Sequence, residues 1–177
     1  MKLADYNAKR KFDQTPEPAG DKLNKSANKL RFVIHKHEAT NLHYDLRLEI
    51  DGVLVSWAVP KGLPTEAGDK NLAMQVEDHP YSYKDFEGVI PEGNYGAGPV
   101  MIWDEGYYHH ISTTDPKLTQ EKIKKKMKEE GEFKFVLHGK KLKGEFAMFR
   151  FKKAGENAWL VIKHDDEYAG RKIAAID

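Results

Sequence analysis

The sequence contains no cysteine among its 177 residues. This absence excludes disulfide bonds, thiolate nucleophiles and cysteine-ligated zinc or iron–sulfur sites, so any bound metal must be held by His, Asp and Glu. The chain also lacks any run close to the roughly 20 apolar residues of a membrane-spanning helix. Its first residues carry charges but no apolar signal region. We therefore expect a cytoplasmic protein.

The composition is that of a globular chain, with 40% hydrophobic and 32% charged residues. The formal net charge of +1 hides a segregation of charge along the sequence. Residues 116–153 hold 13 basic and 5 acidic side chains, whereas residues 75–105 hold 7 acidic side chains and one lysine. A basic surface attracts polyanions, although a lysine-rich run is also typical of a solvated helix face.

Short runs rich in β-branched and aromatic residues, separated by turn residues, predict antiparallel strands. Asp51-Gly52 is typical of a tight hairpin turn. About eight strands around so little helix favour a mainly β fold, a closed or nearly closed antiparallel barrel with one or two flanking helices, because closure removes exposed strand edges. The predicted strands are Leu30–His37, His43–Ile50, Val53–Val59, Ala73–Val76, Gly93–Trp103, Glu132–His138, Gly144–Lys152 and Ala158–His164.

One helix is predicted between Asp115 and Glu130. Asp115 suits the N-cap, Pro116 the first helical position and Gly131 the C-terminal stop. Residues 1–28 lack periodicity, so we expect an N-terminal arm packed on a barrel formed by residues 29–177, within a single domain.

The densest chemical signal is the spacing His43-x-Asp45-x-Arg47 within a predicted strand. Side chains alternate along a strand, so these three share one face, while Leu46 and Leu48 take the packed face. Glu49 continues the polar face. Because unpaired burial of such groups costs several kcal/mol, we expect this face to meet water, a metal or an anion.

His43 and Asp45 can bind one cation together, and His37 can supply a third ligand across the intervening loop. Two imidazoles and one carboxylate suit Mn²⁺, Fe²⁺ or Zn²⁺, and the spacing does not choose among them. Arg47 would direct a guanidinium at an anion such as phosphate. The alternative is an exposed strand with an Asp–Arg pair and incidental histidines.

A second cluster follows at Glu77-Asp-His79-Pro, with Tyr83 four residues beyond His79. His79 can donate a proton or a hydrogen bond to a phosphoryl group, and Tyr83 offers a phenol. A structural turn histidine is the plainer interpretation. Lys61 is a further candidate phosphate contact. The glycine-rich run 88–98 is not a phosphate loop, because G-x-x-x-x-G-K-[ST] is absent.

Taken together, these motifs resemble the 3′-phosphoesterase domain of bacterial DNA ligase D. The resemblance rests on F-V-I-H-K-H from Phe32, H-Y-D-L-R from His43, S-W-A-V-P-K-G from Ser56, E-D-H-P from Glu77 and D-F-E-G-V-I-P-E-G-N-Y-G from Asp85. It implies a small barrel that uses Mn²⁺ to remove a 3′-terminal ribonucleoside and then the 3′-phosphate from a DNA primer-template, which leaves a 3′-hydroxyl for ligation in non-homologous end joining.

The resemblance also assigns roles to residues. It makes His37, His43 and Asp45 the metal ligands and Arg47 the phosphate-binding arginine, with His79, Tyr83 and Lys61 beside the phosphate. Glu17 resembles an acidic residue near the metal. Two positions depart from the pattern: Asn71, beside Lys70, replaces an arginine, and His35 stands where glutamine is common. With no K-x-D-G ligase motif in the sequence, we expect a stand-alone version.

The resemblance implies, as partners, a separate ATP-dependent DNA ligase and a Ku-like end-binding protein, with the enzyme at the nucleoid of a prokaryote. Two sets of lysines are candidate DNA backbone contacts: Lys124, Lys125 and Lys126, and Lys140, Lys141 and Lys143. Two alternatives stay open. One is a non-haem iron oxygenase, with His138 and Arg150 as a cosubstrate site, and the other is a catalytically silent DNA-end or ligase-docking module.

Overall fold

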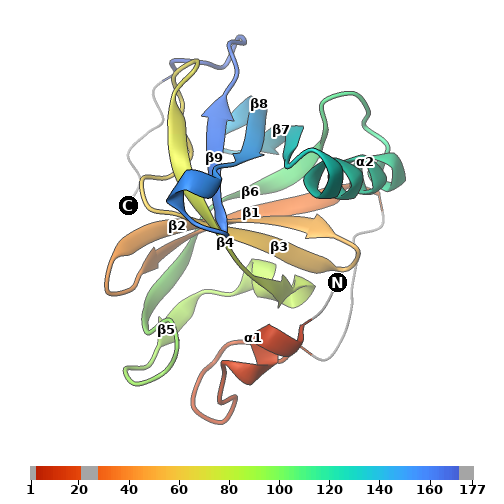
Figure 1. Cartoon of the computed structure of the whole chain (residues 1–177). Helices are drawn as coiled ribbons and strands as arrows, with labels where there is room; N and C mark the ends of the chain where they lie inside the picture. Colours follow the sequence, from red (N-terminus) through yellow and green to blue (C-terminus); the bar gives the residue numbers. More distant parts are fainter. Residues whose placement is uncertain (1–2, 21–27, 172–177) are drawn as a thin grey trace.

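The computed structural model describes residues 3–20 and 28–171, and strands dominate it (Figure 1). The described residues form nine strands: β1 (Leu30–Glu38), β2 (Leu42–Ile50), β3 (Val53–Val59), β4 (Lys70–Pro80), β5 (Gly88–Ile90), β6 (Gly98–His110), β7 (Glu132–Gly139), β8 (Lys143–Arg150) and β9 (Ala158–Lys163). Their helices are α1 (Ala4–Ala8) and α2 (Pro116–Glu129), with short 3₁₀ turns η1 (Tyr81–Asp85) and η2 (Lys152–Ala154).

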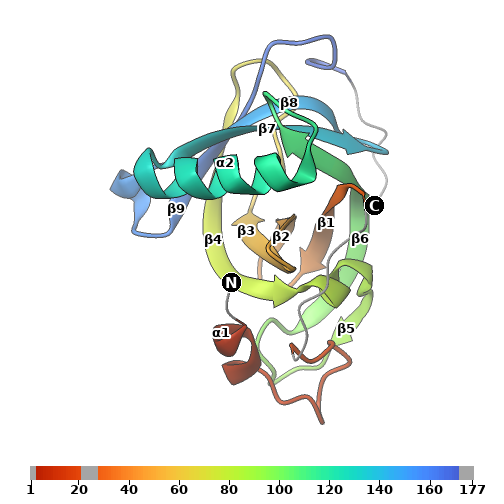
Figure 2. The ribbon, with the colours of Figure 1, turned by 90° about the vertical axis from the view of Figure 1, so that its right-hand side faces the viewer.

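Eight of these strands close into an antiparallel barrel. The strands are ordered β1-β2-β3-β4-β9-β8-β7-β6-β5, and β1 also pairs with β6. This last pairing closes the ring and leaves β5 as an additional strand on β6, as the view along the barrel shows (Figure 2). The predicted barrel class is therefore confirmed.

The barrel interior is filled by aromatic and aliphatic side chains. Strand alternation directs Leu46 and Leu48 inward, and large rings such as Trp57, Phe135 and Trp159 fill the remaining space. The helix α2 lies across one end, where Ile123 is buried against this core.

Local sequence signals explain several element boundaries. The Asp115 carboxylate accepts from the backbone N–H of Lys117 at 2.9 Å and caps α2 as predicted. Asp51 and Gly52 have φ of 53° and 81°, which confirms the tight hairpin turn between β2 and β3.

The predicted strand Gly93–Trp103 is confirmed only from Gly98 onward, and its predicted start at Gly93 is wrong. Residues 91–97 form turns, and β6 begins at Gly98 and continues to His110. The run of glycine and proline favours these turns, and the strand forms only where pairing with β1 and β7 is available. The strand β4 is longer than the predicted Ala73–Val76, so the E-D-H-P motif lies within it.

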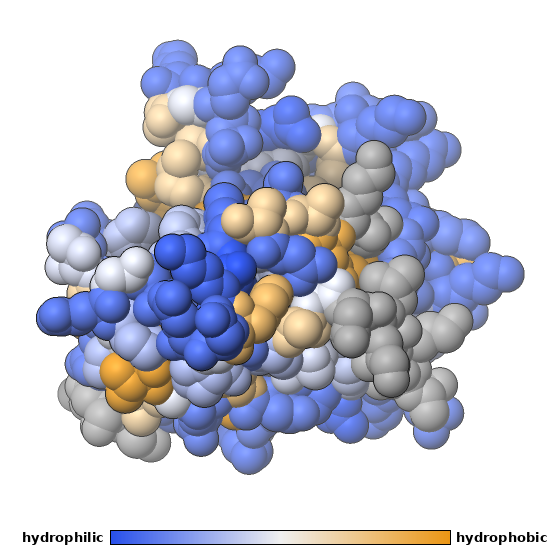
Figure 3. Space-filling model, turned by 90° about the horizontal axis from the view of Figure 1, so that it is seen from below, coloured by the Kyte–Doolittle hydropathy of each residue, from blue (hydrophilic) through white to orange (hydrophobic). Residues whose placement is uncertain are grey.

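Residues 3–20 cover part of the outer surface of the barrel, below it in Figures 1 and 2. Tyr6 packs there in a second apolar cluster with Leu54, Tyr83 and Phe86. Viewed from this side, the surface is mostly hydrophilic with small separate apolar patches (Figure 3). Within the described part of the chain, no helix has the length and apolar character needed to cross a membrane.

Candidate functional site

The candidate site lies on the outer face of the first strands of the barrel. Arg47 on β2 pairs with Ser56 on β3, and the backbone register also places His37 opposite His43 and His35 opposite Asp45. Because residues two apart share a face, His43, Asp45 and Arg47 point to the same side, as predicted.

This face is less exposed than the sequence analysis expected. Glu49 is fully buried and accepts from the backbone N–H of Arg31 at 2.9 Å, so its expected contact with water, a metal or an anion is wrong. A buried carboxylate is tolerated when hydrogen-bond donors satisfy it. Asp45 and Arg47 are also buried, with 4% and 3% of their surface exposed.

Three side chains bring metal-ligating atoms together. One ligand atom each from His37, His43 and Asp45 lies within 4.8 Å of the others, and no other group of three His, Asp or Glu residues does so in the described ranges. The His43 Nε2 lies 3.2 Å from Asp45 Oδ1, and the His37 Nδ1 lies 3.7 Å from Oδ2. The sequence-predicted donor set is thus assembled.

Backbone carbonyls orient both imidazoles. The His37 Nε2–H donates to the Gly96 carbonyl at 2.6 Å, and the His43 Nδ1–H donates to the Asn41 carbonyl at 3.0 Å. Each ring therefore turns its other nitrogen towards Asp45. Such outer contacts fix the tautomer of metal-binding histidines, so the set fits a transition metal ion with oxygen and nitrogen ligands.

The charge of Asp45 is stabilised by its neighbours. Burial alone would raise its pKa, but the Arg47 guanidinium and the neighbouring imidazoles of His37 and His43 hold the pKa below its ordinary value. Burial also disfavours charge on His43, yet the hydrogen bond and charge of Asp45 raise its pKa. The carboxylate is therefore ionised and available as a ligand.

Arg47 is held at two of its three nitrogens. Its Nη2 donates to Asp45 Oδ2 at 3.3 Å and its Nε donates to His35 Nδ1 at 3.1 Å. The Nη1 atom is buried and has no hydrogen-bond partner among the described residues. A buried charged donor without a partner is costly, and a phosphoryl oxygen would satisfy it.

His35 on the neighbouring strand β1 supports Arg47. Its ring is fully buried and its Nε2–H donates to the Phe86 carbonyl at 3.0 Å. Burial and the Arg47 charge lower its pKa to about 3. The ring is therefore neutral at neutral pH, and its Nδ1 lone pair accepts from Arg47.

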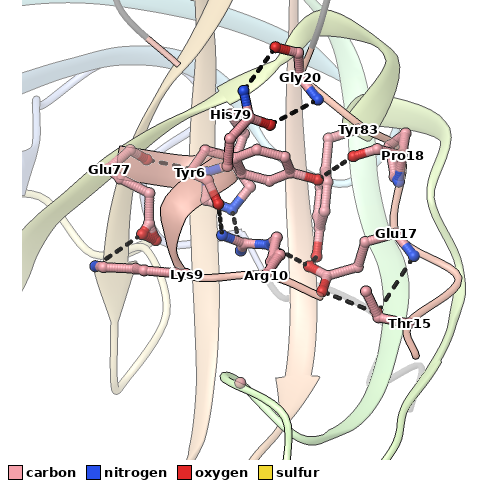
Figure 4. Close-up of polar contacts among 12 residues, drawn as sticks. Tyr6, Lys9, Arg10, Thr15, Glu17, Pro18, Gly20, Glu77, His79 and Tyr83 are labelled. Atoms are coloured by element: carbon pink, nitrogen blue, oxygen red, sulfur yellow. Dashed lines mark hydrogen bonds and ion pairs between the residues drawn. The ribbon is translucent and has the colours of Figure 1, made fainter. Parts of the chain in front are cut away.

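The N-terminal arm contributes Arg10, which sequence reasoning missed (Figure 4). Its Nε donates to Glu17 Oε2 at 3.0 Å and its Nη2 donates to His79 Nε2 at 3.3 Å. The guanidinium also lies 3.9 Å from the centre of the Tyr6 ring. Arg10 lies in a segment without periodicity and 69 positions from His79, so no local pattern could have identified it.

His79 and Tyr83 direct their protons at protein acceptors. The His79 Nδ1–H donates to the Glu77 carbonyl at 2.9 Å, and burial together with Arg47 and Arg10 lowers its pKa well below the ordinary value. The Tyr83 hydroxyl donates to Glu17 Oε2 at 2.6 Å, and burial raises its pKa. Glu17 thus joins Tyr83 to Arg10.

These side chains surround a pocket of about 250 Å³, here called the catalytic pocket because the candidate catalytic residues line it. The residues that line it include Arg10, His37, His43, Asp45, Arg47, His79 and Tyr83. Lys61 does not line it but lies exposed in the turn after β3. Asn71 holds this turn through a 2.7 Å hydrogen bond from its Nδ2 to the Gly62 carbonyl.

The remaining predicted residues lie elsewhere. Lys124 pairs with Asp51, beyond the end of β2 opposite to His43, and Lys126 pairs with Glu130. His138 is hydrogen-bonded to His109, and Arg150 lies over the Trp159 ring. The structure therefore keeps His138 and Arg150 apart from the metal-ligating set.

Comparison with known proteins gives consistent matches. Residues 35–150 match the family model of the DNA ligase D 3′-phosphoesterase domain. The multifunctional non-homologous end joining protein LigD of Pseudomonas aeruginosa is 47% identical over 93% of the chain, and that of Mycolicibacterium smegmatis is 43% identical over 96%. The chain spans only 19% and 21% of the length of these relatives.

Proposed function

The chain belongs to the DNA ligase D 3′-phosphoesterase family, and we propose that it is a metal-dependent phosphoesterase acting on DNA 3′ ends. Its proposed reactions are removal of a 3′-terminal ribonucleoside and of a 3′-phosphate, which leave a 3′-hydroxyl for ligation. The names of the relatives refer to non-homologous end joining. We extend this role to the present chain, with an ATP-dependent DNA ligase and a Ku-like end-binding protein as proposed partners.

The observation that carries the proposal is the unpartnered Nη1 of Arg47 beside the His37, His43 and Asp45 donor set. A phosphate monoester carries about −1.5 to −2 charges near neutral pH. A buried cation and a metal-ligating set at the edge of one pocket suit that dianion. Neither feature is needed by a purely structural barrel face.

His37, His43 and Asp45 would hold the metal, for which we propose Mn²⁺. A bound divalent cation there would polarise a phosphoryl oxygen and offset its charge. Arg47, fixed by Asp45 and His35, presents Nη1 to another phosphoryl oxygen. Arg10, fixed by Glu17 and His79, brings a second guanidinium to the same pocket.

We further propose that His79 and Tyr83 position these groups. The His79 Nε2 accepts from Arg10, and the Tyr83 hydroxyl holds Glu17, which in turn binds Arg10. Their role as proton donors to the leaving oxygen stays a prediction, because neither proton is directed into the pocket in this arrangement.

The test is an end-healing assay on labelled primer-templates that end in one ribonucleotide or in a 3′-phosphate. Conversion to a 3′-hydroxyl is expected with added Mn²⁺ and not with EDTA. Arg47→Ala should lower the rate by about 100-fold or more, the usual effect of removing a donor to developing charge. The exposed Arg31 on β1 supplies the matched control Arg31→Ala, which should retain the rate.

An unmodified protein that binds DNA ends but releases no product with any divalent metal would contradict the enzyme. That result would favour the silent DNA-end or ligase-docking module. Equal rates for Arg47→Ala and Arg31→Ala would contradict the role given to Arg47.

A further inference from the structure

A second cavity, of about 220 Å³, lies outside the catalytic pocket. It is lined mainly by the β7–β8 turn, the loop after β3 and the segment that follows β9. None of its described lining residues is acidic, whereas five are basic: Lys140, Lys141, Lys143, Lys163 and Arg171. We call it the basic pocket.

The turn that presents three of these lysines is rigidly built. The buried Asp104 carboxylate accepts from the backbone N–H groups of Lys140, Lys141 and Leu142 at 2.8, 3.1 and 2.8 Å. A Cβ on Gly139 would lie 2.3 Å from Asp104 Oδ2, so only glycine allows this close approach. The lysines therefore extend from a fixed backbone rather than from a loose loop.

The opposite wall is fixed by Lys163, which is 2% exposed. Its ammonium group lies 2.8 Å from Asp166 Oδ1 and donates to the Glu145 and His164 carbonyls. The Gly170 N–H donates to the Thr65 carbonyl at 2.7 Å and ties the last described residues to the loop after β3. Both walls of the basic pocket are thus held by buried charged groups.

Most of the positive charge in the basic pocket is not neutralised. Asp166 balances Lys163, and Glu105 lies 3.8 Å from the ammonium group of Lys140, whose side chain is 80% exposed. No ion pair with Lys141, Lys143 or Arg171 occurs within the described ranges. Concentrated positive charge of this kind attracts polyanions.

The basic pocket lies at the same end of the barrel as the catalytic pocket. The Lys141 ammonium is 4.4 Å from the centre of the Trp103 ring, which lies 5.6 Å from the Tyr44 ring. Tyr44 follows the metal-ligating candidate His43 on β2. On helix α2, Lys124 instead pairs with Asp51, which lies about 23 Å from Tyr44 along β2.

From this arrangement we propose that the basic pocket binds backbone phosphates of the DNA whose 3′ end enters the catalytic pocket. The proposal rests on the function proposed above, because it takes that DNA as the polyanion. The phosphate backbone would cross the half-buried Tyr44 and Trp103 at the mouth of the barrel. The exposed Lys61 would lie beside that path, because it precedes Gly62, where an added Cβ would lie 3.3 Å from the Tyr44 ring.

The test compares two triple variants of equal charge. One is Lys140→Gln, Lys141→Gln and Lys143→Gln, and the other is Lys117→Gln, Lys122→Gln and Lys128→Gln on α2. Duplex affinity is measured by fluorescence anisotropy between 50 and 200 mM salt. Hydrolysis of a 3′-phosphorylated duplex is compared with hydrolysis of a nucleoside 3′-monophosphate, which is too small to span both pockets.

For the basic-pocket variant we expect at least about tenfold weaker duplex binding and a salt slope lower by about 1 per lysine that contacts a phosphate. Its hydrolysis of the duplex should fall about tenfold further than its hydrolysis of the mononucleotide. The α2 variant should change each quantity by less than about twofold, as screened distant charges do.

Equal effects of the two triple variants would overturn the proposal, because net charge alone would then explain binding. Equal losses on the duplex and the mononucleotide would overturn it as well, since the variant would be disturbing the catalytic pocket. If duplex binding depends on the basic pocket but neither substrate is hydrolysed, the result would support DNA binding by the basic pocket and contradict the proposed enzyme. Absence of duplex binding by the unmodified protein would overturn the basic pocket.

Discussion

The inside of the barrel and the outer face of β1 to β4 are both buried, yet they are built from opposite chemistry. The interior holds Phe135, Phe146 and other apolar side chains that need no hydrogen-bond partners. The outer face, under the N-terminal arm, holds Asp45, Arg47 and His79, all of which need hydrogen-bond partners. Burial alone therefore does not separate a core from a functional site in this molecule.

Hydrogen bonding separates the two regions. On the outer face the charged groups are hydrogen-bonded to polar neighbours, from Asp45 through Arg47 to the neutral His35 and from Glu17 through Arg10 to the neutral His79. Only two buried side-chain atoms lack a partner within the described residues: Trp57 Nε1 and Arg47 Nη1. The first is a neutral group in an apolar interior, and the second is a cation at the edge of a pocket. The charged one therefore indicates a ligand, since the cost of leaving it unpaired is larger.

Removal of an interior ring should give the largest effect on stability and leave the chemistry intact. Phe135 is fully buried and stacks on Phe146 at 5.8 Å. Phe135→Ala should lower the free energy of unfolding by about 3–5 kcal/mol, because it removes apolar contacts and leaves a cavity. Urea unfolding measures this loss. At a temperature where the variant stays folded, its kcat/KM on a 3′-phosphorylated duplex should remain within about twofold of the unmodified protein, because the ring does not line the catalytic pocket. A large loss of kcat/KM would show that the two regions are coupled.

Removal of Arg10 on the outer face should have the converse effect. Arg10→Gln removes a cation from the catalytic pocket and should lower kcat/KM by about 100-fold, with a smaller loss of stability than Phe135→Ala. Steady-state kinetics and urea unfolding of the same preparation measure both quantities.

Lys11 provides a matched control on the same arm, because it is exposed and does not line the pocket. Lys11→Gln should keep its kcat/KM within about twofold, as expected for a surface substitution. If both variants lost activity equally, the arm would matter only as a cover for the barrel.

The same contrast explains which features the sequence could predict. Strand alternation around Asp45, the Asp51-Gly52 turn and the Asp115 cap depend on neighbours in sequence, so the barrel and the metal-ligating face were predicted from them. Contacts between residues distant in sequence could not be predicted in this way. The contact between Arg10 and His79, and the backbone donor that satisfies the buried Glu49, form only when separate strands and the arm meet.

His79 gives the smallest predicted effect on the difference between the barrel interior and the outer face. We expect the outer face to keep this buried imidazole uncharged. Burial and the charges of Arg47 and Arg10 lower its pKa well below 6.5, while the Glu77 carbonyl and the more distant Asp45 oppose that shift. The unfolded chain binds a proton below about pH 6.5 and the folded chain does not, so stability should fall as the pH falls through this range. One such group contributes a slope of up to about 1.4 kcal/mol per pH unit.

His79→Gln keeps an acceptor for Arg10 but removes the titrating group. The free energy of unfolding is measured with urea in EDTA between pH 5 and 7. Its slope against pH should be smaller in the variant, by the equivalent of up to one proton. Both proteins keep a contribution of the same sign from His35, whose pKa is about 3, so the difference between their slopes reports His79. Equal slopes would mean that His79 is protonated in the folded chain, and it could then donate to a phosphoryl group as the sequence analysis predicted. A reduced slope would instead establish His79 as a neutral acceptor that positions Arg10.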